Sequence, residues 1–463
     1  MPKLPLPSRR RVALIHSQLL CIDGVSLEAQ KWVKAYKGLG HKVFLISGKF
    51  CSKPKLPHLE IPELALDHPT VESIKRMAFE TPLGDDESKA LRDLISSTVK
   101  KIKPQLKEFI QANGINMLSI ENVLAIPANV PLGIALKELI EELNIPTIMR
   151  HHDFFWERNY YIKYNNIPHI LGKAFPPKLT RIKNVTISKI AQQDFLRWTG
   201  IDSVVIENAV DFSKLAKPDS FNKNFRKDLG IKQNQLLLLQ PTRILERKRI
   251  ERSIELASQI NTAFKNKDKC VLVITGPASG PESKDYFEFL VKKTRELAVD
   301  VIFASDHVYL HRKEVDGKRV YSIDDAYLHA DLVCFPSDIE GFGNIVIEAA
   351  AYKKPLFVNN YPVLREIKRK GFDFIEMDKE LSKPVFDKTL AILKNKKKRD
   401  TMLNRNFNLV KQHYSIEALE PRLQKLMAQV DKWNLDRVLA ELHSIIYRLS
   451  HGLMGLLFWR KRK

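Results

Sequence analysis

Two glutamates, Glu340 and Glu348, flank a glycine-bearing stretch in an E-x7-E spacing. The stretch follows an apolar, strand-like run, and we expect a helix to begin near Asn344. A helix N-terminus offers unpaired N–H groups to an anion, while glycines let a ligand approach the backbone closely. Carboxylates suit hydroxyl groups, so the segment is typical of a site for a phosphorylated, sugar-like ligand. Helix capping by Glu340 and simple solvation of Glu348 remain the alternative on this pattern alone.

Arg243 and Lys248 form a second candidate group, because they follow an apolar run over 236–240 that predicts a buried strand. Ligands of open parallel sheets bind beyond the carboxyl ends of the strands. A planar guanidinium and a point-charge ammonium could together clamp a diphosphate. A solvated basic loop is the alternative interpretation.

A third group, His151-His152-Asp153, follows a predicted strand over 147–150. Histidine titrates near neutral pH, and Asp153 could orient His152 for proton transfer. Adjacent histidines point apart and a third ligand at fitting spacing is lacking, so the sequence predicts no metal site and a structural His151.

Two further polar residues, Glu121 and Asn122, follow the predicted strand over 117–121. Together with Asp153 they are candidate contacts for an acceptor substrate.

Alternating strands and helices must position these groups. The strands are predicted at 11–16, 42–47, 117–121, 147–150 and 185–188, and in a second series at 236–240, 271–275, 301–303, 332–335 and 355–358. The helices between them are expected over 26–39, 131–143, 250–262 and 284–297. This order predicts two doubly wound α/β units in tandem, with a junction near 211–230 and a cleft where their sheets face each other.

Several motifs are missing from the sequence. No G-x-G-x-x-G follows either first strand and no P-loop is present, which disfavours plain dinucleotide binding and P-loop phosphoryl transfer. The four cysteines, at positions 21, 51, 270 and 334, are far apart and form no C-x-x-C. We therefore expect neither a zinc site nor a disulfide framework, and a reducing compartment.

Taken together, these motifs resemble those of the retaining glycosyltransferases of family 4, the "group 1" glycosyl transferases. The E-x7-E motif encloses G-F-G-N, and Arg243 and Lys248 follow the first strand of the second unit. Four more segments are similar to that family: Asn208-Ala209-Val210-Asp211, with Ala209 in place of glycine, Thr275-Gly276, Ala330-Asp331 and Tyr414-Ser415. The resemblance spans residues 10–425.

The resemblance implies the GT-B fold, an α/β architecture of two facing Rossmann-like doubly wound domains. The first, over 1–210, would bind the acceptor, and the second, over 211–412, the nucleotide-sugar donor. Residues 413–463 would return helices to the first domain and end in a basic amphipathic tail.

The resemblance also implies roles for single residues. Glu340 would contact hydroxyls of the donor sugar, Arg243 and Lys248 would neutralise the departing diphosphate, and His152 would lie near the donor sugar and the acceptor. The implied donor-binding residues are Gly24, Gly276, Gly341, Phe342, Gly343, Asn344, Ile345 and Glu348, the last of which would hold the ribose. Asp23 replaces a glycine that many relatives carry, and we expect it to point toward the acceptor.

The implied reaction is transfer of a hexose from a nucleotide-diphosphate sugar to an acceptor hydroxyl, with retention of configuration. It would serve the synthesis of a glycolipid, a cell-surface polysaccharide or a glycoside, from a UDP-, GDP- or ADP-sugar. No cofactor or metal is expected, since two cations would stabilise the leaving diphosphate. A nucleotide-sugar epimerase of the same fold and a non-catalytic carbohydrate-binding relative are the alternatives.

The 463 residues carry a formal net charge of +22, from 76 Lys and Arg against 54 Asp and Glu. Basic residues gather at 171–189, at 394–411 and at the end of the chain, after helically spaced apolar residues from Leu435 to Leu456. No nucleic-acid-binding motif accompanies them. We therefore expect an anionic membrane surface, presenting a lipid-linked acceptor, as a partner of the tail; docking of the final helix on the first domain is the alternative.

The sequence lacks 18 consecutive apolar residues and the core of a signal peptide. It therefore predicts a cytoplasmic protein, and a peripheral position on the cytoplasmic face of the membrane is the accompanying expectation.

Overall fold

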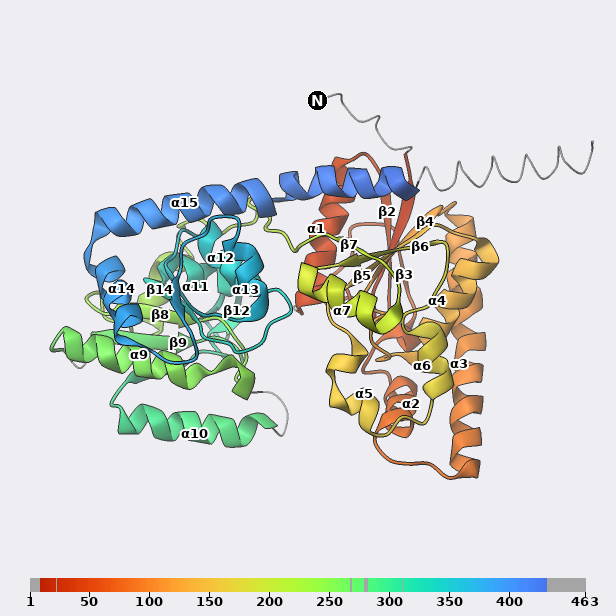
Figure 1. The fold of residues 1–463 in the computed structure, drawn as a ribbon, viewed down its shortest axis with the longest axis horizontal. Helices are drawn as coiled ribbons and strands as arrows, with labels where there is room; N and C mark the ends of the chain where they lie inside the picture. Colours follow the sequence, from red (N-terminus) through yellow and green to blue (C-terminus); the bar gives the residue numbers. More distant parts are fainter. Residues whose placement is uncertain (1–8, 22, 267–268, 279–281, 310, 431–463) are drawn as a thin grey trace, which may run out of the picture.

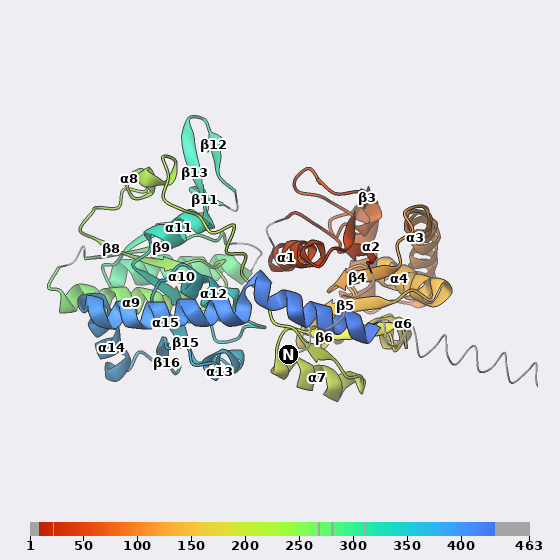
Figure 2. The same cartoon turned by 90° about the horizontal axis from the view of Figure 1, so that it is seen from above.

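The computed structural model describes residues 9–430 except 22, 267–268, 279–281 and 310. Two parallel sheets with helices on both faces stand side by side in it (Figures 1 and 2), which confirms the predicted fold class. The first sheet has the strand order β3-β2-β1-β4-β5-β6-β7, and the second the order β10-β9-β8-β14-β15-β16.

The first sheet and its helices occupy the N-terminal part of the chain. Its strands are β1 (Arg11–Ile15), β2 (Lys42–Ser47), β3 (His58–Glu60), β4 (Met117–Glu121), β5 (Thr147–His151), β6 (Ile182–Thr186) and β7 (Val204–Val205). Its helices are α1 (Gly24–Gly38), α2 (Pro69–Phe79), α3 (Asp85–Ala112), α4 (Val130–Leu143), α5 (Asn159–Lys163), α6 (Pro168–Ala174) and α7 (Lys189–Thr199). The alternation of side chains along β1 sends Val12 and Leu14 to the α1 face, and Ala13 and Ile15 to the face covered by α3 and α4.

The second sheet follows after residue 235. Its strands are β8 (Leu236–Gln240), β9 (Cys270–Ile274), β10 (Asp300–Phe303), β14 (Leu332–Phe335), β15 (Leu356–Asn359) and β16 (Ile375–Met377). The helices of this part are α8 (Phe225–Asp228), α9 (Ile250–Ala263), α10 (Glu282–Glu296), α11 (Ile323–His329), α12 (Asn344–Ala351), α13 (Pro362–Lys368), α14 (Lys383–Lys394) and α15 (Lys396–Tyr414). The central strand β8 reads Leu-Leu-Leu-Leu-Gln because both of its faces are covered, as in other buried parallel strands.

A small third sheet projects from the second domain and was not predicted (Figure 2). It consists of β11 (Val308–Tyr309), β12 (Lys313–Val315) and β13 (Lys318–Ser322), in the order β11-β13-β12. The β12–β13 pair is antiparallel and turns at Asp316 and Gly317, both with positive φ. Its strands are short and rich in lysine and arginine, so they lack the apolar run by which the longer strands were recognised.

The C-terminal helices tie the two domains together (Figure 1). Helix α15 packs on α12 of the second domain, and the chain continues as a helix over 416–430 that crosses to the first domain. There Leu419, Leu423 and Met427 join the core that includes Trp32 of α1. A second link is polar, since the Glu366 carboxylate of α13 accepts hydrogen bonds from the backbone N–H groups of Lys189 and Ile190 at the start of α7, both at 2.9 Å.

A disulfide joins Cys21 to Cys51, contrary to the expectation from sequence. The two cysteines follow the adjacent parallel strands β1 and β2, and Leu19 pairs with Phe50 beside them, which brings their Cα atoms to 4.9 Å. The two cysteines come together because their strands pair in the sheet, so the spacing of cysteines in the sequence could not predict the disulfide. The cysteine pattern therefore no longer supports a reducing compartment.

The other two cysteines, Cys270 and Cys334, are buried within the second sheet as small apolar side chains. Burial raises the pKa of both thiols to about 12.

The predicted amphipathic tail from Leu435 to Leu456 lies outside the described residues. Within the described part of the chain, none of the helices is both long and apolar enough to cross a membrane. The domain limits 1–210, 211–412 and 413–463 stay predictions.

Leu423 gives a test of the docked helix over 416–430, because its side chain is fully buried against the first domain. We expect Leu423→Ala to lower the free energy of unfolding by about 2–5 kcal/mol, the usual cost of a cavity at a buried leucine. Urea unfolding would measure it, with the exposed neighbour Lys425→Ala as the control. Equal stability of the two variants would contradict the packing described here.

Candidate active site

The carboxyl ends of the central strands carry the predicted site residues of both domains. Strands β4 and β5 end at Glu121 and His151, and the segments after β8 and β14 carry Lys248 and Glu340. A Cβ atom on Gly341 would lie 3.3 Å from the carbonyl oxygen of His152. The loop after β14 that carries Gly341, here called the glycine loop, therefore lies directly against the loop after β5 that carries His152, here called the histidine loop.

An ion pair dominates the second-domain half of the site. Lys248 ends a 3₁₀ turn at Glu246–Lys248, and its Nζ lies 2.5 Å from Oε1 of Glu340. Arg247 approaches the same oxygen to 3.4 Å. Burial lowers the pKa of Lys248, and the Glu340 carboxylate opposes that shift. The two predicted residues thus stabilise each other's charge in a largely buried place.

Arg243 stands apart from this pair. Its side chain is exposed, and among the described residues it has no ion-pair partner. Gly276, another predicted donor-binding residue, packs against its backbone: a Cβ there would lie 2.5 Å from the Arg243 nitrogen, and the Gly276 N–H donates to Thr242. A glycine is therefore required at position 276 for the loops after β8 and β9 to pack together. The positive charge of Arg243 lies beside them without an ion-pair partner among the described residues.

Gly343 sets the start of helix α12. It has a φ of +94°, and a Cβ there would lie 2.0 Å from the Tyr361 hydroxyl, which donates to the carbonyl oxygen of Phe342. The side chain of Phe342 is buried, so only its backbone can serve a ligand. Asn344 and Ile345 are the first residues of α12, where helical N–H groups lack partners within the helix.

Glu348 lies one turn further along α12 and accepts a hydrogen bond of 2.9 Å from the Tyr327 hydroxyl. Burial raises the pKa of its carboxyl group, and the Lys31 ammonium on α1 of the first domain opposes the shift. The Glu348 carboxylate thus accepts its hydrogen bond from the second domain, while a charge of the first domain affects its pKa.

His152 is held by Glu121 and Asn122, two of the three residues that were predicted to contact the acceptor. Its Nε2 lies 2.9 Å from Oε2 of Glu121, and its backbone N–H donates to Oδ1 of Asn122. Asn122 has a φ of +60°, and its amide donates to Asp153, which also pairs with Arg158. The side chains of Glu121 and Asn122 thus bond to residues of the histidine loop, and Asp153 is one of the residues that they hold.

The pKa shifts in this loop come mainly from burial. Burial raises the pKa of Glu121 to about 7, with Arg150 opposing, and lowers the pKa of His152 to about 3. His152 is therefore neutral at physiological pH. His151 is fully buried, bonded to Asn184 and packed on Phe195, as expected for a structural residue.

Asp23 has hydrogen-bond partners within the first domain, and its expected direction toward an acceptor stays a prediction. Its carboxylate caps helix α1 by accepting from the Ser26 N–H at 2.9 Å, and it also accepts from Gln18. An aspartate before a helix commonly takes this role. Gly24 begins α1 with open space where a Cβ would lie, so its place at a helix N-terminus is what could serve a phosphate.

Sequence reasoning missed three polar residues at the centre of the first-domain half. His16, at the end of β1, donates from Nδ1 to the carbonyl oxygen of Glu121, and Arg150 and Glu28 are almost completely buried. A charged residue inside the predicted strand over 147–150 was the available signal for Arg150. Among the described residues, no cluster of three His, Cys, Asp or Glu could hold a metal.

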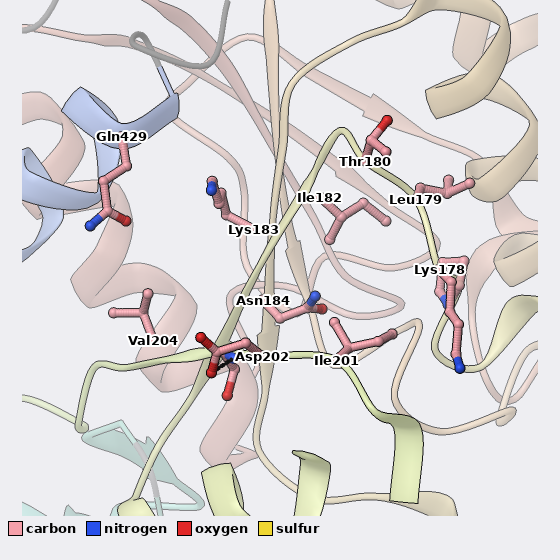
Figure 3. A pocket seen from close by; sticks show the side chains of 12 residues that line it. Lys178, Leu179, Thr180, Ile182, Lys183, Asn184, Ile201, Asp202, Val204 and Gln429 are labelled. Carbon is pink, nitrogen blue, oxygen red and sulfur yellow. Dashed lines mark hydrogen bonds between the residues drawn. The ribbon is translucent and has the colours of Figure 1, made fainter.

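A surface pocket of about 610 Å³ lies elsewhere (Figure 3). It is lined by Ile182 and Lys183 at the start of β6, by Ser203 and Val204 before and in β7, and by Gln429 of the C-terminal helix. Since it opens at the amino ends of these strands, it is separate from the strand ends that carry the site.

Comparison with known proteins identifies what the second domain resembles. Residues 221–409 match the family described as "Glycosyl transferases group 1". The chain is 29% identical over 439 residues to a mannosylglucosylglycerate synthase of Thermotoga maritima, covering 90% of this chain and 99% of that relative. It is also 29% identical over 385 residues to the enzyme of that name from Petrotoga mobilis, covering 79% and 86%.

Solved structures share the fold. HepE of Anabaena in complex with UDP-glucose has a TM-score of 0.60 at 15% identity, over 91% of this chain and 100% of that one. A sucrose-phosphate synthase of Thermosynechococcus elongatus has a TM-score of 0.61 at 16% identity, over 92% and 100%. These structures confirm the fold that the motifs implied, and the match of residues 221–409 confirms the resemblance to the group 1 glycosyl transferases.

Glu121 provides a pH-dependent test of the buried loop. A carboxyl group whose pKa rises on folding stabilises the fold at low pH, and this stabilisation is lost as the pH rises through the folded value. We expect the stability of the wild type relative to Glu121→Gln to fall between pH 5 and pH 8, because glutamine mimics only the protonated acid. Urea unfolding across this range would measure the difference, with the exposed Glu60→Gln as the control. A difference that stays constant would contradict the raised pKa.

Proposed function

We propose, on the premise that residues 221–409 form a group 1 glycosyl transferase domain, that this protein transfers a hexose from a nucleotide-diphosphate sugar to an acceptor hydroxyl with retention of configuration. The observation that carries the proposal is the meeting of the two half-sites. The Lys248–Glu340 pair and the start of α12 lie on one side, and Gly341 brings them against His152 on the other.

The donor diphosphate is proposed to bind between Arg243 and the first turn of α12. Arg243 is exposed and the helix start presents N–H groups, so both can meet an incoming anion. Lys248 adds its charge from within the ion pair. Glu340 would turn its carboxylate to hydroxyl groups of the sugar, and Glu348, beside Tyr327, to the ribose.

The chemistry follows from where charge develops. Negative charge grows on the diphosphate as the glycosidic bond breaks, and fixed cations stabilise it without reorganisation. We propose that a metal is dispensable for this reason. We propose that retention arises because the acceptor approaches from the side of the leaving group, whose phosphate oxygen is the proposed proton acceptor. His152, neutral and firmly oriented, is proposed to contact the sugar rather than to exchange protons.

The names of the relatives favour a small acidic glycoside as acceptor. Both are called mannosylglucosylglycerate synthase, and glycerate carries a carboxylate. The net charge of +22 suits such a substrate. Contact with an anionic membrane, through the basic stretches at 171–189 and 394–411 and the C-terminal tail, is a separate proposal supported by charge alone. A cytoplasmic location stays a further proposal, to which the Cys21–Cys51 disulfide lends no support.

Arg243 is the best residue for testing the donor site, because its exposed side chain can be removed without disturbing the core. We expect Arg243→Ala to lower turnover by about a hundredfold or more, as loss of one charge-stabilising group commonly does. Lys248→Ala is expected to act likewise, with a loss of stability from the unpaired Glu340. Release of nucleoside diphosphate from UDP-, GDP- and ADP-sugars would report turnover.

The matched control is Lys292→Ala, which removes a highly exposed cation on α10. Unchanged turnover in a folded Arg243→Ala protein would refute the assignment of this residue to the diphosphate.

A further inference from the structure

Arg150 is a buried cation at the end of β5 that contacts several polar groups. Only 1% of its side chain is exposed. Its Nη2 lies 2.7 Å from Oδ1 of Asn208 and 3.3 Å from Oε2 of Glu28, and its guanidinium carbon lies 4.7 Å from the centre of the Trp32 ring. The guanidinium thus contacts the connecting segment between the domains as well as helix α1.

One branch of this network runs to the histidine loop. Arg150 Nη1 lies 3.6 Å from Oε2 of Glu121, and that same oxygen lies 2.9 Å from Nε2 of His152. Glu121 is fully buried, and its other oxygen, Oε1, has no hydrogen-bond partner among the described residues. The orientation of His152 therefore depends on a carboxylate that Arg150 faces.

The other branch runs into the second domain. Asn208, which accepts from Arg150, donates through Nδ2 to Oδ1 of Asn344 at 2.8 Å. Asn344 is the first residue of α12, the helix whose start forms the proposed donor site. One guanidinium is therefore two contacts away from the proposed acceptor-side histidine and two contacts away from the donor-side helix.

Stability alone is a weak explanation for such a group. Burying an arginine with the carboxylates of Glu28 and Glu121 costs desolvation energy that well-packed apolar side chains would avoid. Lys31 on α1 pairs with Glu28 at 2.5 Å and donates to the backbone of Ala209, which ties the network further to the connecting segment.

We propose that Arg150 is a positioning residue that fixes His152 of the first domain and Asn344 of the second in one arrangement, through Glu121 and Asn208. The role in turnover rests on the proposed function. Arg150 acts through these residues and does not itself touch substrate.

The charges around Glu121 are consistent with this role. Burial has the largest effect on the Glu121 carboxyl group and raises its pKa, and Glu28 on α1 raises it further. Arg150 and His16, which directly follows β1, lower this pKa. Loss of contact with Arg150 would therefore favour protonated Glu121, and a protonated acid would offer His152 a donor in place of an acceptor.

A double-mutant cycle on Asn208→Ala and Glu121→Gln tests the coupling, since the two residues are joined through Arg150. We expect each single variant to lower kcat by roughly tenfold to a hundredfold, as loss of a hydrogen bond to a charged group does. The double variant should lose clearly less than the product of the two effects, because each single change already breaks the connection. Losses that multiply would overturn the proposal.

A second readout separates this proposal from the proposed function, because it needs no turnover. Histidine-selective ¹⁵N NMR reports the protonation and tautomer of His152, whose signals are identified with His152→Gln. Asn208→Ala should change them although Asn208 contacts Arg150 and Asn344 and not His152 in the described part of the chain. The exposed Asn234→Ala is the matched control and should change nothing.

An unchanged His152 spectrum in folded Asn208→Ala would overturn the proposal. Failure of the wild type to consume any UDP-, GDP- or ADP-sugar would instead count against the proposed function, and the spectrum would still decide the role of Arg150.

Discussion

The burial of the Arg150 guanidinium, near the end of β5 in the first domain, is the constraint on which the rest of the site depends. A buried cation is tolerated only where carboxylates and carbonyl groups surround it, and here they come from α1, β4 and the segment after β7. Among the described residues, Nη2 of Arg150 is hydrogen-bonded whereas Nε and Nη1 have no hydrogen-bond partner, so the charge depends on each of these elements keeping its place. The strands β4 and β5 are parallel neighbours, so their carboxyl ends lie at the same edge of the sheet. The elements that surround Arg150 therefore also fix the loop after β5 that carries His152.

The second domain also places positive charge at the site, but it contains one paired and one exposed cation. Lys248 and Glu340 neutralise each other at 2.5 Å, while Arg243 stays exposed. Under the proposed function, one firmly paired cation and one exposed cation would suit a site that receives a diphosphate and later releases it. Two positive charges account for little of the net +22, so most of the excess lies outside this site.

Much of the fold could be predicted because buried parallel strands and amphipathic helices leave regular patterns. The strand over 236–240 and the helix from Asn344 are found as predicted, while the donor-binding role of the E-x7-E motif stays a prediction. The polar network could not be predicted, since Glu28 and Arg150 are 122 positions apart and meet only after the sheet has formed. The same reason hid the Cys21–Cys51 disulfide, and the hydrogen bond by which Asp23 caps helix α1 was also not predicted.

The central claim is that both half-sites serve one transfer reaction with retention, and ¹H NMR of the anomeric proton tests it most directly. The protein would be incubated with each of UDP-, GDP- and ADP-linked glucose and mannose, with glucosylglycerate as acceptor. We predict loss of one donor signal and growth of a glycoside signal of the same anomeric configuration, with an equal amount of nucleoside diphosphate. A product of inverted configuration, or an epimerised sugar still attached to its nucleotide, would contradict the account.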